Sequence, residues 1–415
     1  MDKKFYKQNR RALAALFEEA NAVAVFSTGY SVTCSADENY PFQVNTNCFY
    51  LTGVTQENVY LVLIKKDGLY EERLYIDAYD EMYAKWVGHR LTKKEASELS
   101  GVPMKYIRYR SDFESDLDAL TADAVLYLDL ETNRNTNFHS FGLSIRDRYQ
   151  EKAEVKDAYP LLISLRYAKK PCEVEEIKKA IDVTKKGIES LMANARPGMK
   201  EYELEAYFDF VLKTEGQHKH AFTTIAAAGK NATTLHYSAN NTEMTDGDLV
   251  LFDLGAKSGG YSADITRTFP VNGKFTPLQR TVYDIVLAAN KKVEASARAG
   301  MTMGELQKIC VEVLTEGCLN AGLIETPEEI KRVYFHGVSH SLGLDTHDPN
   351  VRNTPLPVGA VITNEPGLYF PEHRIGIRIE DDLLITKGKA VNLSADIIKE
   401  ADEIEAYMQK CKASV

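Results

Sequence analysis

The sequence predicts a protein of mixed α/β class with two domains. At 415 residues the chain is long enough for two domains, each with its own hydrophobic core. Short apolar runs alternate with helical segments in the first part, and a unit of two helices followed by strands occurs twice in the second part. We therefore expect an N-terminal α/β domain over residues 1–165, followed by a domain of two similar halves over residues 166–415.

Composition and charge exclude several classes of partner. The formal net charge is −10 and no basic block offsets it, which argues against nucleic acid as the main partner. The charged start lacks the apolar core of a signal peptide, and no run approaches membrane-spanning length. Six cysteines without paired spacing indicate reduced thiols. We expect a cytoplasmic protein that binds neither nucleic acid nor membranes.

The first 165 residues show the pattern of an α/β domain, without a cluster of His, Asp and Glu at ligand-like spacing. Helices are expected near residues 8–20, 93–99 and 112–120. Apolar runs predict four strands, at Val23–Phe26, Val59–Ile64, Leu74–Ile76 and Val125–Asp129. We expect this domain to shape or assemble a site. Its one tryptophan, Trp86, lies in a polar segment and is either a core residue or a contact residue.

After linker-like residues 165–171, the second part repeats itself. A helix expected over 173–195 precedes Ala195–Met199, which matches Ala297–Met301 with an offset of 102 residues. Each copy opens a second helix, and we expect Gly216 and Gly317 to end these helices. A repeat of this length indicates one domain of two related halves with a cleft between them.

The strands after each helix pair carry carboxylates. A hairpin centred on Ser258 and Gly259 would place Asp253 opposite Asp264. A second hairpin, centred on Glu372 and His373, would place Glu365 opposite Glu380. Like charges at opposed positions destabilise a sheet, and aspartate disfavours strands. A cation between the members of each pair explains both patterns.

Histidines accompany these carboxylates. Residues 336–348 hold His336, His340 and His347 among glycines and serines, and Gly337 stands where a helical zinc box requires glutamate. His340 with four carboxylates and no thiolate suits two divalent ions, with Mn²⁺ preferred and Co²⁺ or Zn²⁺ as alternatives. Such ions activate a water for hydrolysis. Glu365 could also exchange a proton with that water, while His236, His336 and His347 would surround a substrate carbonyl.

In order and setting, five residues resemble the metal ligands of the pita-bread metallopeptidases, which include methionine aminopeptidases, prolidases and Xaa-Pro aminopeptidases. The five are Asp253, Asp264, His340, Glu365 and Glu380. The motifs Asp-Ile-Thr-Arg-Thr-Phe, His-Gly-Val-Ser-His and Asn-Glu-Pro-Gly carry this resemblance. The first domain, with Ser-Ala-Asp at 35–37, Tyr-Pro-Phe at 40–42, Asn-Thr-Asn at 45–47 and Tyr-Leu-Thr-Gly at 50–53, is similar to that of Xaa-Pro aminopeptidases (aminopeptidase P).

The resemblance implies a pseudo-two-fold pita-bread catalytic domain and a metallo-exopeptidase that releases the residue preceding proline at a peptide's N-terminus. It implies catalytic roles for Glu365, Arg378 and three histidines, which are His236, His336 and His347. It also implies substrate-side roles for the same histidines and for Tyr369. It further implies a homodimer or homotetramer in which Trp86 reaches a neighbouring subunit's site. One departure is Gln43, which stands where many relatives carry a basic residue.

Two alternative functions share this fold. An Xaa-Pro dipeptidase (prolidase) has the same metals and histidines, but a positive group caps the free carboxylate of its dipeptide. His373, Arg374 or a residue of the first domain could supply that group. A non-catalytic pita-bread module would bind peptides without metal, and such modules lose the ligands that this chain retains.

Overall fold

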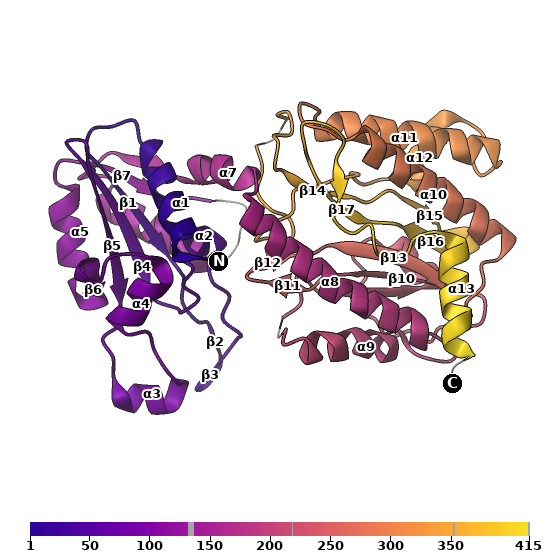
Figure 1. Cartoon of the computed structure of the whole chain (residues 1–415), viewed down its shortest axis with the longest axis horizontal. Coiled ribbons are helices and arrows are strands. Elements are labelled where there is room, and N and C mark those ends of the chain that lie inside the picture. Colours follow the sequence, from indigo (N-terminus) through magenta and orange to yellow (C-terminus); the bar gives the residue numbers. More distant parts are fainter. Residues whose placement is uncertain (132–136, 218, 352, 414–415) are drawn as a thin grey trace. The chain divides into compact units, whose positions relative to one another are not determined.

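The chain folds into two units of mixed α/β structure, Met1–Leu165 and Arg166–Val415 (Figure 1). The computed structural model describes residues 1–131, 137–217, 219–351 and 353–413. None of the helices in these ranges combines the length and the apolar character that a membrane span requires. The predicted α/β class is confirmed.

A six-stranded mixed sheet forms the centre of the first unit, in the order β6-β5-β4-β1-β7-β8. The pairs β1–β4 and β4–β5 are antiparallel, and the pairs β1–β7, β5–β6 and β7–β8 are parallel. These strands are β1 (Ala22–Ser27), β4 (Tyr60–Lys66), β5 (Leu69–Ile76), β6 (Ile107–Tyr109), β7 (Val125–Leu128) and β8 (Val155–Asp157). The four predicted strands correspond to β1, β4, β5 and β7. A separate hairpin joins β2 (Thr33–Ser35) to β3 (Glu38–Asn39).

Helices precede, separate and follow these strands along the chain. They are α1 (Lys3–Ala15), α2 (Thr46–Thr52), α3 (Glu81–Val87), α4 (Lys93–Ser100), α5 (Phe113–Thr121), α6 (Asn137–Tyr149) and α7 (Tyr159–Tyr167). The first helix begins five residues earlier than predicted, because Asp2 caps it by accepting a hydrogen bond from the Lys4 amide. Strand residues such as Val25 and Val62 pack with Phe113 and Leu117 of α5 in one buried core.

A buried ion pair joins separate elements of the first unit. Arg10 of α1 and Glu72 of β5 form two hydrogen bonds, from Nε to Oε2 at 2.8 Å and from Nη2 to Oε1 at 3.0 Å. The Arg10 side chain is fully buried. Its Nη1 also donates to the carbonyls of Leu51 and Ser100, at the ends of α2 and α4. This guanidinium therefore connects helix α1 to strand β5 and to the C-terminal ends of helices α2 and α4.

The second unit contains two helix pairs with strands between them (Figure 1). Its helices are α8 (Pro171–Asn194), α9 (Glu201–Thr214), α10 (Pro277–Ser296), α11 (Met303–Asn320), α12 (Ile330–Val333) and α13 (Ala401–Lys412). The strands of the first half are β9 (Ile225–Ala228), β10 (Leu249–Leu254), β11 (Lys257–Ser258), β12 (Tyr261–Ser262) and β13 (Ile265–Pro270). Those of the second half are β14 (Val361–Asn364), β15 (Gly367–Phe370), β16 (Ile375–Arg378), β17 (Asp381–Leu384) and β18 (Val391–Asn392).

The sequence repeat corresponds to a repeated structure. Helix α8 packs on α9, and α10 packs on α11. In the turn between the helices of each pair, the glycine amide donates to a backbone carbonyl beyond the second helix: Gly198 to Met244, and Gly300 to Leu356. The predicted helix stop at Gly317 is wrong, because α11 continues to Asn320. A Cβ at residue 317 would lie 2.7 Å from a side-chain carbon of Ile285, so this glycine permits close packing of α10 on α11.

The predicted register of the first carboxylate hairpin is also wrong. Asp253 pairs with Thr266, and the pair Leu254–Ile265 follows. The turn lies at Gly259 and Gly260, one residue later than expected, and both have positive φ, at 54° and 90°. Two-residue hairpin turns with positive φ at both central residues match the twist of the strands, so two consecutive glycines occupy the turn.

The second hairpin has the predicted register. Asn364 pairs with Asp381 in β14–β17, and Gly367 pairs with Arg378 in β15–β16. Both pairs belong to one continuous register, which sets Glu365 opposite Glu380. The residues between the two pairs, including Pro366, are outside the regular ladder because proline has no amide hydrogen to donate.

We predict that Glu72→Gln lowers the free energy of unfolding by about 3–5 kcal/mol, because it leaves the Arg10 charge buried without its partner. Burial raises the pKa of Glu72, but the hydrogen bonds and charge of Arg10 outweigh burial, so the pKa lies below its ordinary value. The stabilisation by this ion pair is therefore complete at pH values above the ordinary titration range of glutamate. It is lost as the pH falls through the lowered pKa of Glu72. Urea unfolding followed by circular dichroism measures both effects.

Glu71→Gln is the matched control, because Glu71 pairs with Arg73 at a third of full exposure. Its effect should be below about 1 kcal/mol. Equal losses in the two variants would contradict a special role for the buried pair.

Candidate active site

A cavity of about 600 Å³ lies within the second unit. It gathers nine of the residues that the sequence predicted for the site. They are Asp253, Asp264, His236, His336, His340, His347, Glu365, Arg378 and Glu380. Strands from both halves therefore contribute to a single cavity. Two further predicted residues do not line it: Tyr369 lies behind His336 and Arg378, and Trp86 belongs to the first unit.

The carboxylates lie close together although they are buried. Asp264, His340 and Glu380 each offer a ligand atom, and these atoms all lie within 4.8 Å of one another. His340 Nε2 is 3.3 Å from Asp264 Oδ2 and 3.6 Å from Glu365 Oε1. Asp264 and Glu380 are only 3% and 2% exposed. Buried like charges at this spacing require a cation or a proton to offset their repulsion.

The pKa values of these groups reflect the same repulsion. Burial, followed by repulsion from neighbouring carboxylates, raises the pKa of Asp264 and of Glu380 well above the ordinary values. Burial raises the pKa of Glu365 to about 7, although the charge of Arg378 opposes the shift. Each carboxyl therefore needs a positive charge nearby to ionise fully at neutral pH.

The residues predicted as ligands fit divalent metal ions. They are four carboxylates and one imidazole, without a thiolate, and such a set suits ions such as Mn²⁺. Asp253 Oδ2 accepts a hydrogen bond from Arg378 at 2.6 Å, whereas its buried Oδ1 has no hydrogen-bond partner among the described residues. A buried oxygen of this kind, on a residue that lines a cavity with other carboxylates, is a candidate ligand atom.

Backbone contacts hold His340 with one nitrogen toward the carboxylates. Its Nδ1 faces the Ser341 carbonyl at 3.1 Å, and since a carbonyl only accepts, Nδ1 carries the hydrogen. Nε2 is thus left with a lone pair that faces Asp264 and Glu365. Burial, followed by the charge of His347, lowers the pKa of His340 to about 4, so the ring is neutral. A neutral imidazole held by a backbone carbonyl is the usual form of a metal ligand.

His336 belongs to a chain of hydrogen bonds at the cavity wall. Its Nδ1 donates to the Gly337 carbonyl at 2.8 Å, so its Nε2 accepts from the Tyr369 hydroxyl at 2.9 Å. Arg378 Nη1 donates to the same hydroxyl at 3.1 Å. Burial and the Arg378 charge lower the pKa of His336 to about 4, and burial raises the pKa of Tyr369 to about 12. His336 is therefore neutral, and Tyr369 retains its proton.

Two threonines that the sequence analysis did not single out support the carboxylates. Thr266 Oγ1 donates to Glu380 Oε2 at 2.6 Å, and Thr363 Oγ1 donates to Glu365 Oε1 at 3.2 Å. Each threonine lies on a strand, two residues along the chain from a predicted ligand that adjoins that strand, and alternate residues of an extended chain share a face. Strand alternation was therefore a signal that could have identified both. The apolar lining residues, such as Phe222 and Leu235, carried no such signal.

Trp86 lies on α3 and is 82% exposed, so it is not a core residue of its unit. Tyr79, Met82, Tyr83 and Val87 are exposed on the same short segment. The interpretation of Trp86 as a core residue is therefore wrong, and its role as a contact residue stays a prediction.

Comparisons with known proteins agree with this architecture. Residues 175–387 match the model of metallopeptidase family M24, and residues 6–127 match that of the aminopeptidase P N-terminal domain. Among curated proteins, the Xaa-Pro aminopeptidase of Escherichia coli (strain K12) is 34% identical, with 97% of each chain covered. Xaa-Pro aminopeptidase 3 of Homo sapiens is 30% identical, over 89% of this chain and 78% of that protein.

Solved structures give the same result for the whole chain. A protein from Bacillus anthracis described as an aminopeptidase P is 42% identical, with a TM-score of 0.94 and full coverage of both chains. Aminopeptidase P from Escherichia coli, solved with the inhibitor Pro-Leu, is 33% identical, with a TM-score of 0.91, and the match covers 100% of this chain and 99% of that one. The chain therefore belongs to metallopeptidase family M24, the pita-bread metallopeptidases, and carries an N-terminal domain of the aminopeptidase P type.

Proposed function

We propose that this protein is an Xaa-Pro aminopeptidase, which hydrolyses the first peptide bond of peptides with proline at the second position. The observation that carries the proposal is the single cavity lined by Asp253, Asp264, His340, Glu365 and Glu380. We propose these five as ligands of two divalent ions, preferably Mn²⁺. The names of the relatives, Xaa-Pro aminopeptidases over nearly the whole chain, support this substrate class.

Bound divalent ions would lower the pKa of a water and polarise the carbonyl of the scissile bond. Glu365 lines the cavity and would take a proton from that water and return it to the leaving nitrogen. The substrate-side residues His236 and His347 line the cavity and can hydrogen-bond to the peptide carbonyl. His336 lines the cavity beside them, with its two ring nitrogens already hydrogen-bonded to Gly337 and Tyr369. Arg378 is paired with Asp253 and Tyr369, so it orients one ligand and the hydrogen-bonded His336.

The lining of the cavity favours peptides longer than dipeptides. Among the described residues that line it, Arg378 is the one lysine or arginine, and its guanidinium is paired with Asp253. Arg374 pairs with Asp248 at 2.9 Å, and neither it nor His373 lines the cavity. A dipeptidase needs a positive group to bind the free carboxylate of its substrate. Since no such free group lines the cavity from the described residues of the second unit, the lining favours the aminopeptidase over the prolidase. The retained ligand set disfavours a non-catalytic module.

Hydrolysis of an Xaa-Pro-Xaa tripeptide beside the matching Xaa-Pro dipeptide tests the proposal, with Mn²⁺ present and after chelation. We expect turnover of the tripeptide with Mn²⁺, little turnover of the dipeptide, and loss of activity in the chelator. A strong preference for the dipeptide would indicate a prolidase. Full activity after exhaustive chelation would remove the metal centre from the proposal.

We predict different losses for two histidines that lie 4.2 Å apart, ring to ring. His340→Ala should lower the metal content below two ions per chain, because it removes a ligand. His347→Ala should leave the metal bound and lower kcat by about 10²–10³, the usual effect of removing one donor to a developing oxyanion. Elemental analysis and steady-state kinetics on the same preparations separate the two effects.

His220→Ala is the control, because His220 pairs with Asp209 and does not line the cavity. It should retain both metal and turnover. Loss of metal in His347→Ala, with metal retained in His340→Ala, would reverse the assigned roles.

We propose that Trp86 contacts the substrate in the site of a neighbouring copy, within a homodimer or homotetramer. Its exposure supports a contact role, because an indole on the surface of a lone chain has no packing function. Trp86→Ala should therefore change the free energy of unfolding by less than about 0.5 kcal/mol. It should raise KM for proline peptides while the unfolding transition stays in place.

Met82→Ala, on the same helix and also exposed, serves as control for this variant and should leave KM unchanged. A fully active monomer in analytical ultracentrifugation would contradict a shared site.

We also propose that the protein acts in the cytoplasm. All six cysteines are unpaired in the structure, which is the form expected in a reducing compartment. Fractionation of cells that produce the protein would test this location.

A further inference from the structure

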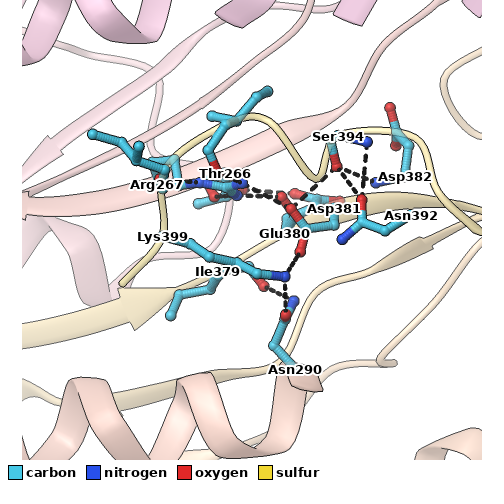
Figure 2. Close-up of polar contacts among 12 residues, drawn as sticks. Thr266, Arg267, Asn290, Ile379, Glu380, Asp381, Asp382, Asn392, Ser394 and Lys399 are labelled. Carbon is cyan, nitrogen blue, oxygen red and sulfur yellow. Dashed lines mark hydrogen bonds and ion pairs between the residues drawn. The ribbon is translucent and has the colours of Figure 1, made fainter. Parts of the chain in front are cut away.

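A second polar cluster lies behind the ligand Glu380 and outside the cavity lining (Figure 2). We call it the support network, and it consists of Arg267, Asn290, Asp381 and Lys399. Its members come from β13, α10, β17 and the segment that precedes α13. Arg267, Asn290 and Asp381 are fully buried, and the Lys399 side chain is 13% exposed. The function proposed above assigns no role to any of them.

All five N–H groups of Arg267 donate hydrogen bonds, to Asp381 and to four backbone carbonyls. Nη1 donates to the carbonyls of Thr266 and Glu380, at 2.9 and 2.6 Å. Nη2 donates to Asp381 Oδ1 at 2.7 Å and to the Ile397 carbonyl at 3.1 Å, and Nε donates to the Ile398 carbonyl at 3.0 Å. A guanidinium with five acceptors in fixed directions determines the positions of all five. It therefore fixes the backbone of a ligand, Glu380, against the strand that follows Asp264.

Lys399 is saturated in the same way. Its three N–H groups donate to Asp381 Oδ2 at 2.6 Å, Asn290 Oδ1 at 2.9 Å and Glu294 Oε2 at 3.2 Å (Figure 2 shows the first two). Asp381 is thus held between two cations. Burial raises its pKa, but the charges of Arg267 and Lys399 outweigh burial and lower it to about 2. The two cations are balanced by Asp381 and Glu294, so this network leaves no positive charge for the metal ligands.

Asn290 extends the network to the second hairpin. Its Nδ2 donates to the carbonyls of Asn364 and Ile379, at 3.2 and 3.3 Å, and Asn364 Nδ2 donates back to the Asn290 carbonyl at 2.9 Å. Asn364 directly precedes Glu365, and Ile379 directly precedes Glu380. The side-chain oxygen of Asn290 is the acceptor for Lys399. One amide therefore connects the backbone beside two ligands to the lysine.

The C-terminal segment makes one further connection. Ser394 Oγ accepts from the Asp382 amide at 3.1 Å and donates to Asp381 Oδ1 at 3.1 Å. Asp382 Oδ2 in turn accepts from the amide of Asp264 at 3.2 Å. The backbone at three of the five proposed ligands, Asp264, Glu365 and Glu380, is thus tied to residues 394–399.

We propose that the support network sets the spacing of the strands that carry Asp264, Glu365 and Glu380, so that Arg267 and Lys399 are positioning residues of the metal centre. Residues 394–399 then help to position the metal ligands although they do not line the cavity. This inference rests on the proposed metal centre. According to this inference, the support network affects the affinity for metal and the turnover. It does not affect which substrate binds, because none of its members lines the cavity.

Binding of Mn²⁺ to Lys399→Met tests the inference, measured by isothermal titration of the metal-depleted protein. Outer groups that orient metal ligands commonly contribute 10–100-fold to metal affinity. We expect Lys399→Met to bind Mn²⁺ about 10-fold or more weakly than the wild type, with an unchanged KM for a proline tripeptide at saturating Mn²⁺. Arg267→Lys keeps the charge but loses some of the five hydrogen bonds of the guanidinium. It should therefore weaken Mn²⁺ binding as well.

Arg90→Met is the matched control. Arg90 is a cation of the first unit, its side chain is 10% exposed, and it contacts two carboxylates, Glu57 and Asp77. It should bind Mn²⁺ like the wild type. Circular dichroism of each variant shows whether it is folded, and Lys399→Met, which removes the most exposed member, is the variant expected to fold in any case.

The outcomes separate this inference from the proposed function. Wild-type affinity for Mn²⁺ in folded Lys399→Met and Arg267→Lys would overturn the inference and leave the metal centre intact. Equal weakening in Arg90→Met would also overturn it, because general loss of stability would then be the cause. A wild-type protein that binds no Mn²⁺ would overturn the metal centre itself.

Discussion

Repulsion among buried carboxylates is the constraint on which the rest of this structure depends. Asp264 and Glu380 are almost fully buried, and Asp253 and Glu365 line the same cavity. Burial of even one unpaired carboxylate costs several kcal/mol, so a cluster of four is stable only with compensating positive charge. Arg378 offsets one charge through Asp253, and the neighbouring histidines are neutral. The remainder of that charge is what the proposed divalent ions would supply.

The fold separates the residues proposed as metal ligands from the residues that hold them in position. Each half of the second unit contributes a hairpin, and each hairpin carries two of the carboxylates. Behind them, the two cations of the support network are balanced by Asp381 and by the neighbouring Glu294, and every N–H of Arg267 and Lys399 is bound to an acceptor. A rigid, electrically balanced support lets the cavity keep an excess of negative charge without distortion of the strands.

Residue types and spacing predicted much of the site but not its exact pairing. Four carboxylates on strands are unfavourable enough by themselves to indicate a cation, and the cavity gathers all four. The register of the first hairpin was missed because three consecutive residues, Ser258, Gly259 and Gly260, could each form the turn. Only the positive φ of both glycines selects between them. The second register was predicted correctly because a non-glycine turn around Glu372 left less choice.

The support network could not have been predicted from periodicity. Its members are separated by up to 132 residues, from Arg267 to Lys399, and each is a polar residue that sequence alone places on the surface. Helix α3, which carries Trp86, was missed because its seven residues bury nothing and so show no apolar stripe. The stop expected at Gly317 failed for a related reason. A glycine required for helix packing has the same sequence signature as one that ends a helix.

The most direct test of the central claim is calorimetric unfolding of the metal-depleted protein, with and without Mn²⁺. If the buried carboxylates need a cation, Mn²⁺ at 100 times its Kd should stabilise the folded protein by about 2.7 kcal/mol per site. The unfolding transition should therefore shift to higher temperature as Mn²⁺ is added, and Asp264→Asn should weaken this shift. A transition that does not move at any concentration of Mn²⁺, Co²⁺ or Zn²⁺ would contradict the account.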